Sequence, residues 1–166
     1  MVKTPHQEAA RKEIKTFFRQ LTNMYFMLFA GIFLFMVTAI IVVYFQKALR
    51  PDYTTFLYFG APVSSMALML MARKLAADRF KTGFDQPKLY QKMDAYRSGV
   101  VLQMIVLDGA AFVMLLAYVF SGVFLFIYLC MAVMTVFLLS KPGMEKFMKE
   151  MNLNEMERKV VRDHSY

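Results

Sequence analysis

The sequence predicts an all-α, polytopic membrane protein with four transmembrane helices in two hairpins and short amphipathic helices at both ends. Three observations lead to this prediction. The chain of 166 residues is 58% hydrophobic, yet it contains 20 Lys and Arg and 12 Asp and Glu residues. Residues 21–46 and 53–72 contain no charge at all, and residues 98–140 contain one, Asp108. Runs of about 20 uncharged apolar residues are what a helix needs to cross a bilayer.

The same composition excludes several other classes of protein. A soluble globular domain and a disordered chain do not contain such long uncharged apolar runs. The single cysteine, Cys130, cannot form an internal disulfide, so a secreted disulfide scaffold is also excluded. The first apolar run is too long for a signal peptide, and the basic segment before it itself has a helical pattern.

The predicted transmembrane domain covers residues 23–141. Its four spans are residues 23–45, 54–72, 99–120 and 123–139. Residues 1–22 form a cytoplasmic N-terminal helix, and residues 142–166 form an amphipathic cytoplasmic tail. These outer pieces are too short to build an independent domain.

The orientation follows from the distribution of positive charge. Of the 20 Lys and Arg residues, 18 lie in the N-terminal arm, the connection 73–97 and the C-terminal tail. Four spans place these three segments on one side, and the positive-inside rule makes that side the cytoplasm. Both termini are therefore predicted to be cytoplasmic. The net charge of +8 is then explained by topology and by anionic lipid headgroups, and no nucleic-acid partner is expected.

The outer helices have recognisable start and stop signals. Thr4 and Pro5 provide a cap and a first helical position for the N-terminal helix. Its apolar face lies either in the membrane interface or against the other cytoplasmic helices. This face consists of Ala10, Ile14, Phe17, Phe18 and Leu21.

Two further helices are expected to extend beyond the apolar runs. The second span continues to about Lys81, where Thr82 and Gly83 offer a stop. Residues 85–87 then restart a helix, which leads into the third span. In the tail, apolar residues repeat at helical spacing, and Asn154 caps a last short helix. The repeating tail residues are Met144, Phe147, Met148 and Met151.

Asp108 is the one charged residue expected inside the membrane. It follows Arg97 by 11 residues, which places it about 16 Å deep, near the midplane. A carboxylate at that depth costs about 3 kcal/mol on insertion scales, so the neutral form is favoured and a hydrogen-bond partner is required. The same counting places Pro62 and Cys130 at a similar depth. The polar candidates for one midplane site are Asp108, Ser64, Ser65, Cys130 and the carbonyl of Tyr58, which Pro62 leaves without its helical donor.

Two interpretations of this site remain open. In the structural interpretation, Asp108 is a neutral acid that locks two helices, for example by donating to the Tyr58 carbonyl, or it contacts a partner subunit. In the functional interpretation, it handles a proton or a cation. Gly109, Ala110 and Ala111 would let a neighbouring helix approach closely in either case.

Other chemistries lack their sequence signals. The chain contains no HExxH, GxSxG, P-loop or CxxC motif, so no enzymatic activity and no catalytic residue are predicted. Its 16 methionines could in principle pass Cu(I), but no Met- or His-rich entry segment accompanies them. Methionine also serves as flexible core filler, so no metal and no cofactor are expected.

The third span resembles one known group of proteins. Residues 96–112, with Leu107-Asp108-Gly109-Ala110-Ala111, and residues 117–119 are similar to small uncharacterised bacterial four-helix membrane proteins with an acid at this place. The resemblance extends through the fourth span to Lys141-Pro142. It implies a bacterial inner-membrane location and no particular activity.

The predicted function is therefore assembly. The chain would be an accessory, scaffolding or assembly subunit of a membrane complex, or a self-associating bundle that forms a homo-oligomer. The alternative is a small proton- or cation-coupled transporter or channel that uses Asp108.

Overall fold

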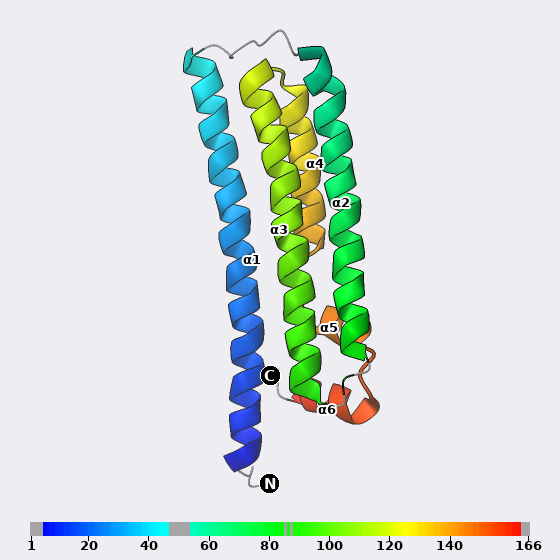
Figure 1. Ribbon diagram of the computed structural model, residues 1–166. Coiled ribbons are helices and arrows are strands. Elements are labelled where there is room, and N and C mark those ends of the chain that lie inside the picture. Colours follow the sequence, from blue (N-terminus) through cyan, green and yellow to red (C-terminus); the bar gives the residue numbers. More distant parts are fainter. Residues whose placement is uncertain (1–4, 47–53, 85, 87, 164–166) are drawn as a thin grey trace.

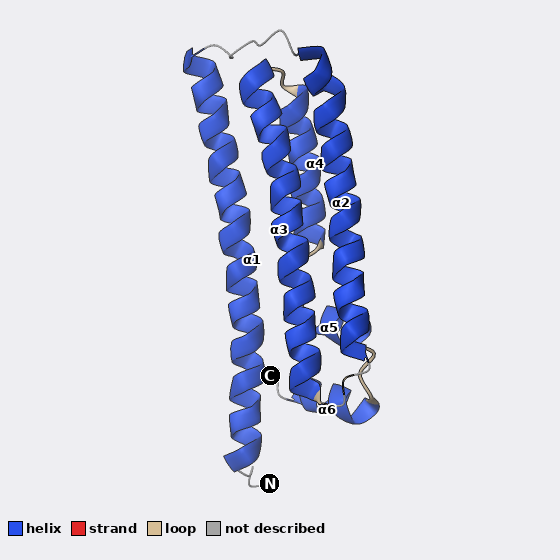
Figure 2. Cartoon of the chain, in the orientation of Figure 1, coloured by secondary structure: helices blue, strands red, loops and turns tan. Residues whose placement is uncertain are grey.

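The computed structural model describes residues 5–46, 54–84, 86 and 88–163, and these residues form six helices and no strand (Figures 1 and 2). The prediction of an all-α chain is confirmed. The helices are α1 (Pro5–Gln46), α2 (Thr54–Phe84), α3 (Leu89–Ser121), α4 (Leu125–Leu139), α5 (Met144–Glu150) and α6 (Glu155–Asp163).

Three helices, α1, α2 and α3, are each long and apolar enough to cross a membrane. The fourth predicted span, residues 123–139, is shorter than expected. Helix α4 has 15 residues, or about 22 Å, and it reaches the length of a span only together with α5, from which it is bent by 79°. Gly122, in a left-handed conformation with φ 67°, ends α3 and delays the start of α4. The structure therefore contains three candidate spans, or four if the bent pair counts as one.

The N-terminal helix and the first span form one continuous helix, α1, of 42 residues. It begins at Pro5, as predicted, whereas Thr4 lies outside the described residues. Ile14 and Leu21 are buried, and the ring of Phe18 meets the edge of Phe147 in α5 at 5.7 Å. The apolar face of this segment thus packs on the other helices, which was one of the two alternatives.

Helix α2 extends beyond the apolar run and ends at Phe84, close to the predicted stop at Thr82–Gly83. Asp85 and Pro87 lie outside the described residues, and α3 continues from Leu89 through the third apolar run without a break. Gly99 lets α2 and α3 approach closely. A Cβ at this position would lie 2.6 Å from the ring of Phe80, so no other residue fits without a shift.

The helices pack around α3 and not as two separate hairpins. Helices α2, α4 and α1 all pack against α3, with the largest interface between α2 and α3. Figure 1 shows α1 standing apart from α2, with α3 between them. The prediction that the first two spans pack against each other as a hairpin is therefore wrong. The physical reason is that α3 buries apolar side chains over a wide arc, including Leu107, Ala111 and Tyr118, whereas α1 buries only a narrow stripe that includes Leu21 and Ile32.

A small cluster of aromatic rings joins the short helices to the long ones. Phe147 of α5 is completely buried, and its ring lies 5.0 Å from Tyr96 of α3. Tyr96 in turn stacks on Phe80 of α2 at 5.6 Å. Burial raises the pKa of Tyr96, the nearby charge of Glu150 raises it further, and a hydrogen bond to the Gly143 carbonyl opposes both effects. The Tyr96 hydroxyl therefore stays neutral and acts as a donor.

An ion pair between α3 and α6 helps to hold α6 at the same end of the molecule. The ammonium group of Lys92 donates to both carboxylate oxygens of Glu157, at 2.9 and 3.0 Å. The backbone N–H of Asn154 also donates to Glu157, at 2.9 Å, and the N–H of Arg158 donates to the Asn154 carbonyl. This arrangement starts α6 after Asn154, where the sequence placed its cap.

Candidate functional site

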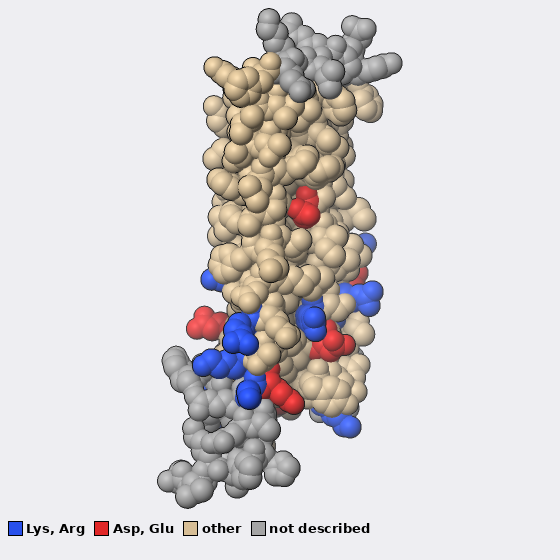
Figure 3. All heavy atoms as spheres, turned by 90° about the vertical axis from the view of Figure 1, so that its left-hand side faces the viewer, with Lys and Arg blue, Asp and Glu red and all other residues tan. Residues whose placement is uncertain are grey.

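Charged side chains gather at one end of the bundle, called here the charged end. In the described residues they lie in the first turns of α1 and α3, the last turns of α2, and in α5 and α6. Figure 3 shows this segregation on one face, with a broad uncharged band above the charged end. The described ends of the chain, in α1 and α6, both lie there (Figure 1).

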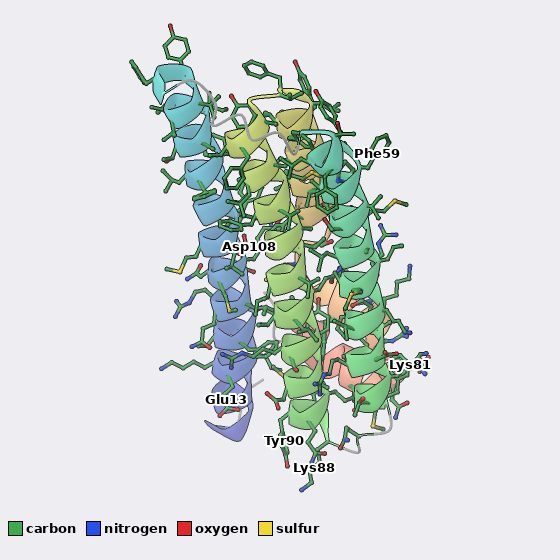
Figure 4. All side chains as sticks on the ribbon, turned by 45° about the horizontal axis from the view of Figure 1, so that its top comes forward. Glu13, Phe59, Lys81, Lys88, Tyr90 and Asp108 are labelled. Carbon is green, nitrogen blue, oxygen red and sulfur yellow. The ribbon has the colours of Figure 1, made fainter. Side chains whose placement is uncertain are left out.

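Asp108 is the one acidic residue of the described chain that lies away from the charged end, within the band that otherwise contains no charged side chain. Figure 4 shows it about halfway along the bundle, between α1 and α3. The rings of Phe35 in α1 and Phe112 in α3 lie 5.0 Å apart. Because these two helices are parallel, a residue of α1 lies at about the same level as the residue of α3 whose number is 77 higher. The same offset places Gly31 of α1 at the level of Asp108. A Cβ at Gly31 would meet no atom within 4 Å, so Gly31 faces open space.

Asp108 has no polar partner in the described part of the chain. Its side chain is half-buried, and no hydrogen bond or ion pair joins it to another described residue. The expected hydrogen bond to the Tyr58 carbonyl is not formed. The helical geometry explains this result, because Asp108 lies on the side of α3 that faces α1, whereas Tyr58 belongs to α2.

The other predicted polar residues do not gather around Asp108. Ser65 is buried and donates across the interface to the Ala110 carbonyl at 3.3 Å, so it links α2 to the opposite side of α3. Ser64 donates within its own helix, to the Ala61 carbonyl. Tyr58 is 41% exposed, and its ring lies near Phe126 of α4 at 5.8 Å.

Cys130 and Pro62 also take separate places. Cys130 is completely buried in α4. Pro62 lies inside α2, which remains one helix from Thr54 to Phe84. The depth of these residues could be estimated by counting along each span. The direction in which each side chain points could not, because it depends on which helices are neighbours.

The three small residues after Asp108 have different roles. Ala110 and Ala111 are completely buried and allow α3 to pack closely. Gly109 differs from the expectation, because a Cβ at this position would meet no atom within 4 Å. Gly109 therefore faces outward and is not needed for packing between the described helices.

Two hollows at the charged end were not expected from the sequence. The first is a cavity of about 820 Å³ lined by the lower parts of α1, α2 and α3, including Glu13, Phe17 and Tyr90; Figure 4 shows Glu13 and Tyr90 near this end. The second is a groove of about 400 Å³ between α2 and α5. Four cations and one acid line this groove: Arg73, Lys81, Lys146, Lys149 and Glu150.

The only sequence signal for the groove is the spacing of its cations. Arg73 and Lys81 are two steps of four residues apart on α2, and Lys146 and Lys149 are one step of three apart on α5. Such steps place side chains on one face of a helix. The pattern was missed because α2 and α5 are 60 residues apart in the chain, and only the packing brings them together.

The described residues contain no group of three His, Cys, Asp or Glu side chains that could hold a metal ion. Comparison of the chain with protein-family models, curated proteins and solved structures found no match.

Proposed function

We propose that this chain is a bacterial inner-membrane protein that crosses the bilayer four times, with both termini in the cytoplasm, and acts by assembly. It serves as an accessory, scaffolding or assembly subunit of a membrane complex, or it associates with further copies of itself. The observation that supports the proposal is Asp108, a half-buried carboxyl group without a partner in an otherwise uncharged band.

The energetic argument concerns the place of this carboxyl group. A polar acid near the middle of a bilayer costs about 3 kcal/mol unless another group hydrogen-bonds to it. In the described residues, Asp108 finds no such group. A neighbouring protein chain can supply one, and assembly then removes the cost.

The surface beside Asp108 also suits a partner helix. Gly31 and Gly109 both face open space, so neither α1 nor α3 presents a bulky side chain at these two positions. Small residues let helices approach closely in a membrane, where dispersion contacts and hydrogen bonds drive association. The two glycines and the acid together favour a helix with a polar side chain as the partner.

The transporter alternative has less support in the described residues. An ion pathway needs a chain of polar groups across the membrane. Ser64, Ser65 and Cys130 belong to other interfaces, and none of them hydrogen-bonds to Asp108.

Disulfide cross-linking in membranes tests the proposal. The natural cysteine is first removed by Cys130→Ala, and one new cysteine is introduced as Gly31→Cys, beside Asp108. We expect oxidation to cross-link Gly31→Cys to a second copy. Where the partner is a different subunit, a bifunctional thiol-to-amine reagent should capture one defined protein at this position.

The matched control is Met66→Cys, at a position in α2 that is 65% exposed. It should cross-link far less. Equal and weak cross-linking at both positions would contradict assembly through the surface of α1 and α3 at the level of Asp108, because collisions in the membrane would then explain all of the product.

A further inference from the structure

The groove between α2 and α5 is strongly charged. Arg73 and Lys81 of α2 form one wall, and Lys146 and Lys149 of α5 form the other. With Glu150 as the one acid, the lining residues carry a net charge of +3. Phe80 and Ala77 contribute apolar surface between the two walls.

Three of these four cations are not fixed by a hydrogen bond or an ion pair to a described residue. Arg73, Lys81 and Lys149 form no hydrogen bond or ion pair there. Lys146 is oriented by the Ser140 carbonyl, to which it donates at 3.4 Å, and by Glu150 at 3.9 Å. The groove therefore gathers positive charge without neutralising it, and this arrangement is favourable only when an anion is bound or the groups are fully solvated.

Glu150 limits the charge of the groove without cancelling it. Burial raises the pKa of its carboxyl group, whereas the positive charges of Lys146 and Lys149 act in the opposite direction. One of its oxygens, Oε2, is buried and has no hydrogen-bond partner in the described residues.

The groove is continuous with an exposed apolar stripe on α2. Leu70, Met66 and Val63 lie one, two and three turns away from Arg73 toward the other end of the bundle, and they are 60%, 65% and 67% exposed. In Figure 4, Lys81 and Phe59 mark the two ends of this side of α2. A molecule with an anionic head and apolar chains would place its head among the cations and its chains along the stripe.

We propose that the groove lined by Arg73, Lys81, Lys146 and Lys149 binds the phosphate-containing headgroup of an anionic phospholipid, whose acyl chains lie along Leu70 and Met66. This inference rests on the proposed placement in a membrane, where Arg73 is at the boundary of the uncharged band. Basic pockets between helices at this boundary have the chemistry that binds anionic headgroups. The bound lipid would fill the space between α2 and α5 and hold α5 at the bilayer surface.

The test uses tryptophan fluorescence, because the natural chain contains no tryptophan. The full chain carrying Leu70→Trp is reconstituted in phosphatidylcholine vesicles, and quenching by brominated phosphatidylglycerol is compared with quenching by brominated phosphatidylcholine. The matched reporter is Met71→Trp, because Met71 is at the same depth, is 52% exposed and points away from the groove.

We expect brominated phosphatidylglycerol to quench Leu70→Trp more strongly than brominated phosphatidylcholine does. At Met71→Trp the two lipids should quench equally. The ratio of the two quenching efficiencies is the preference for the anionic lipid. Arg73→Gln and Lys149→Gln should each reduce the preference about fivefold, as expected for one basic group near an anionic surface. Lys74→Gln is the control for charge alone, because Lys74 is next to Arg73 but does not line the groove; it should leave the preference unchanged. Glu150→Gln, which removes the one negative charge, should increase it.

Several results would overturn the proposal. Equal preference at both reporters, or equal losses in Arg73→Gln and Lys74→Gln, would indicate general attraction to the anionic surface. Displacement of the lipid by excess inorganic phosphate would indicate a site for a soluble anion. If neither reporter is quenched by either lipid, the membrane placement itself fails, whereas quenching of both without preference overturns the lipid site alone.

Discussion

The ion pair between Lys92 and Glu157 should control how firmly α6 docks on α3. The two side chains are 7% and 18% exposed, and the ammonium group contacts both carboxylate oxygens. Val161 of α6 is also completely buried. The substitution Glu157→Gln keeps the size of the side chain but leaves the Lys92 ammonium group without a counter-charge.

The expected loss in the free energy of docking of α6 follows from how exposed the two charged groups are. Removing one partner of a fully buried ion pair costs about 3–5 kcal/mol. Because Glu157 is partly exposed, water can reach the vacated site, and we expect a smaller loss of about 2 kcal/mol in the free energy of docking. This loss corresponds to an increase of about thirtyfold in the undocked population of α6.

Amide hydrogen exchange of the protein in detergent micelles measures this population. The amides of α6 should exchange about thirtyfold faster in Glu157→Gln, while those of α3 should not change. Glu155→Gln is the matched control, because Glu155 is an exposed acid in the same first turn of α6 and forms no ion pair with a described residue. Equal acceleration in both variants would refute the reasoning, since the loss would then come from helix electrostatics and not from Lys92.

The same pair predicts the pH dependence of docking. Burial alone would raise the pKa of Glu157, but the hydrogen bonds from Lys92 and the Asn154 N–H, together with the charge of Lys92, lower it below its ordinary value of 4.5. The stabilisation is therefore fully present above pH 4.5 and is lost as the pH falls through the lowered pKa. Exchange of the α6 amides, corrected for its intrinsic pH dependence, should rise only below pH 4.5. A rise near neutral pH would contradict the assignment to Glu157.

Three further predictions concern contacts of Asp108, Phe147 and Ser65. Asp108→Leu should reduce the mass of the assembly measured by light scattering. Asp108→Asn, which can still form hydrogen bonds, should leave this mass unchanged. An ion flux into proteoliposomes that Asp108→Asn abolishes would instead favour a transporter. Phe147→Ala should cost about 3–5 kcal/mol, because it empties a completely buried site, and should lower the midpoint of thermal unfolding in detergent; an unchanged midpoint would mean that the aromatic cluster does not hold α5. Ser65→Ala should cost about 0.6 kcal/mol, the typical value of a hydrogen bond between membrane helices. Ser64→Ala, whose hydroxyl donates within α2, should cost less, and equal losses would argue against the bond to Ala110.

Much of the fold could be predicted because the signals are local. The charge-free runs located the long helices, and Pro5 and Gly83 marked the first residue of α1 and the end of α2 to within one residue. The short length of α4 was missed. Because the left-handed Gly122 ends α3, helix α4 begins only at Leu125, two residues after the predicted start of the fourth span at Val123.

The arrangement of the helices could not be predicted from such local signals. Chain order suggested that the first two spans form a pair, but packing depends on which side chains fit together, and α2 fits α3 where Gly99 receives the ring of Phe80. The candidate site shows the same limit. Counting residues gave the depth of Asp108 and Ser65 but not their directions. Asp108 of α3 faces α1, whereas Ser65 of α2 faces α3.

The unbroken length of α1 has a mechanical consequence. Forty-two residues make a rod of about 63 Å, roughly twice the thickness of a hydrocarbon core, and no proline or other break interrupts it after Pro5. Such a rod acts as a lever. A tilt of about 5° around its middle moves each end by about 3 Å. At the charged end, that movement shifts Ile14 and Phe17, which line the cavity of about 820 Å³. Because the tilt of a membrane helix responds to the thickness of the bilayer, the width of this cavity is geometrically linked to the lipid around the opposite half of the same helix.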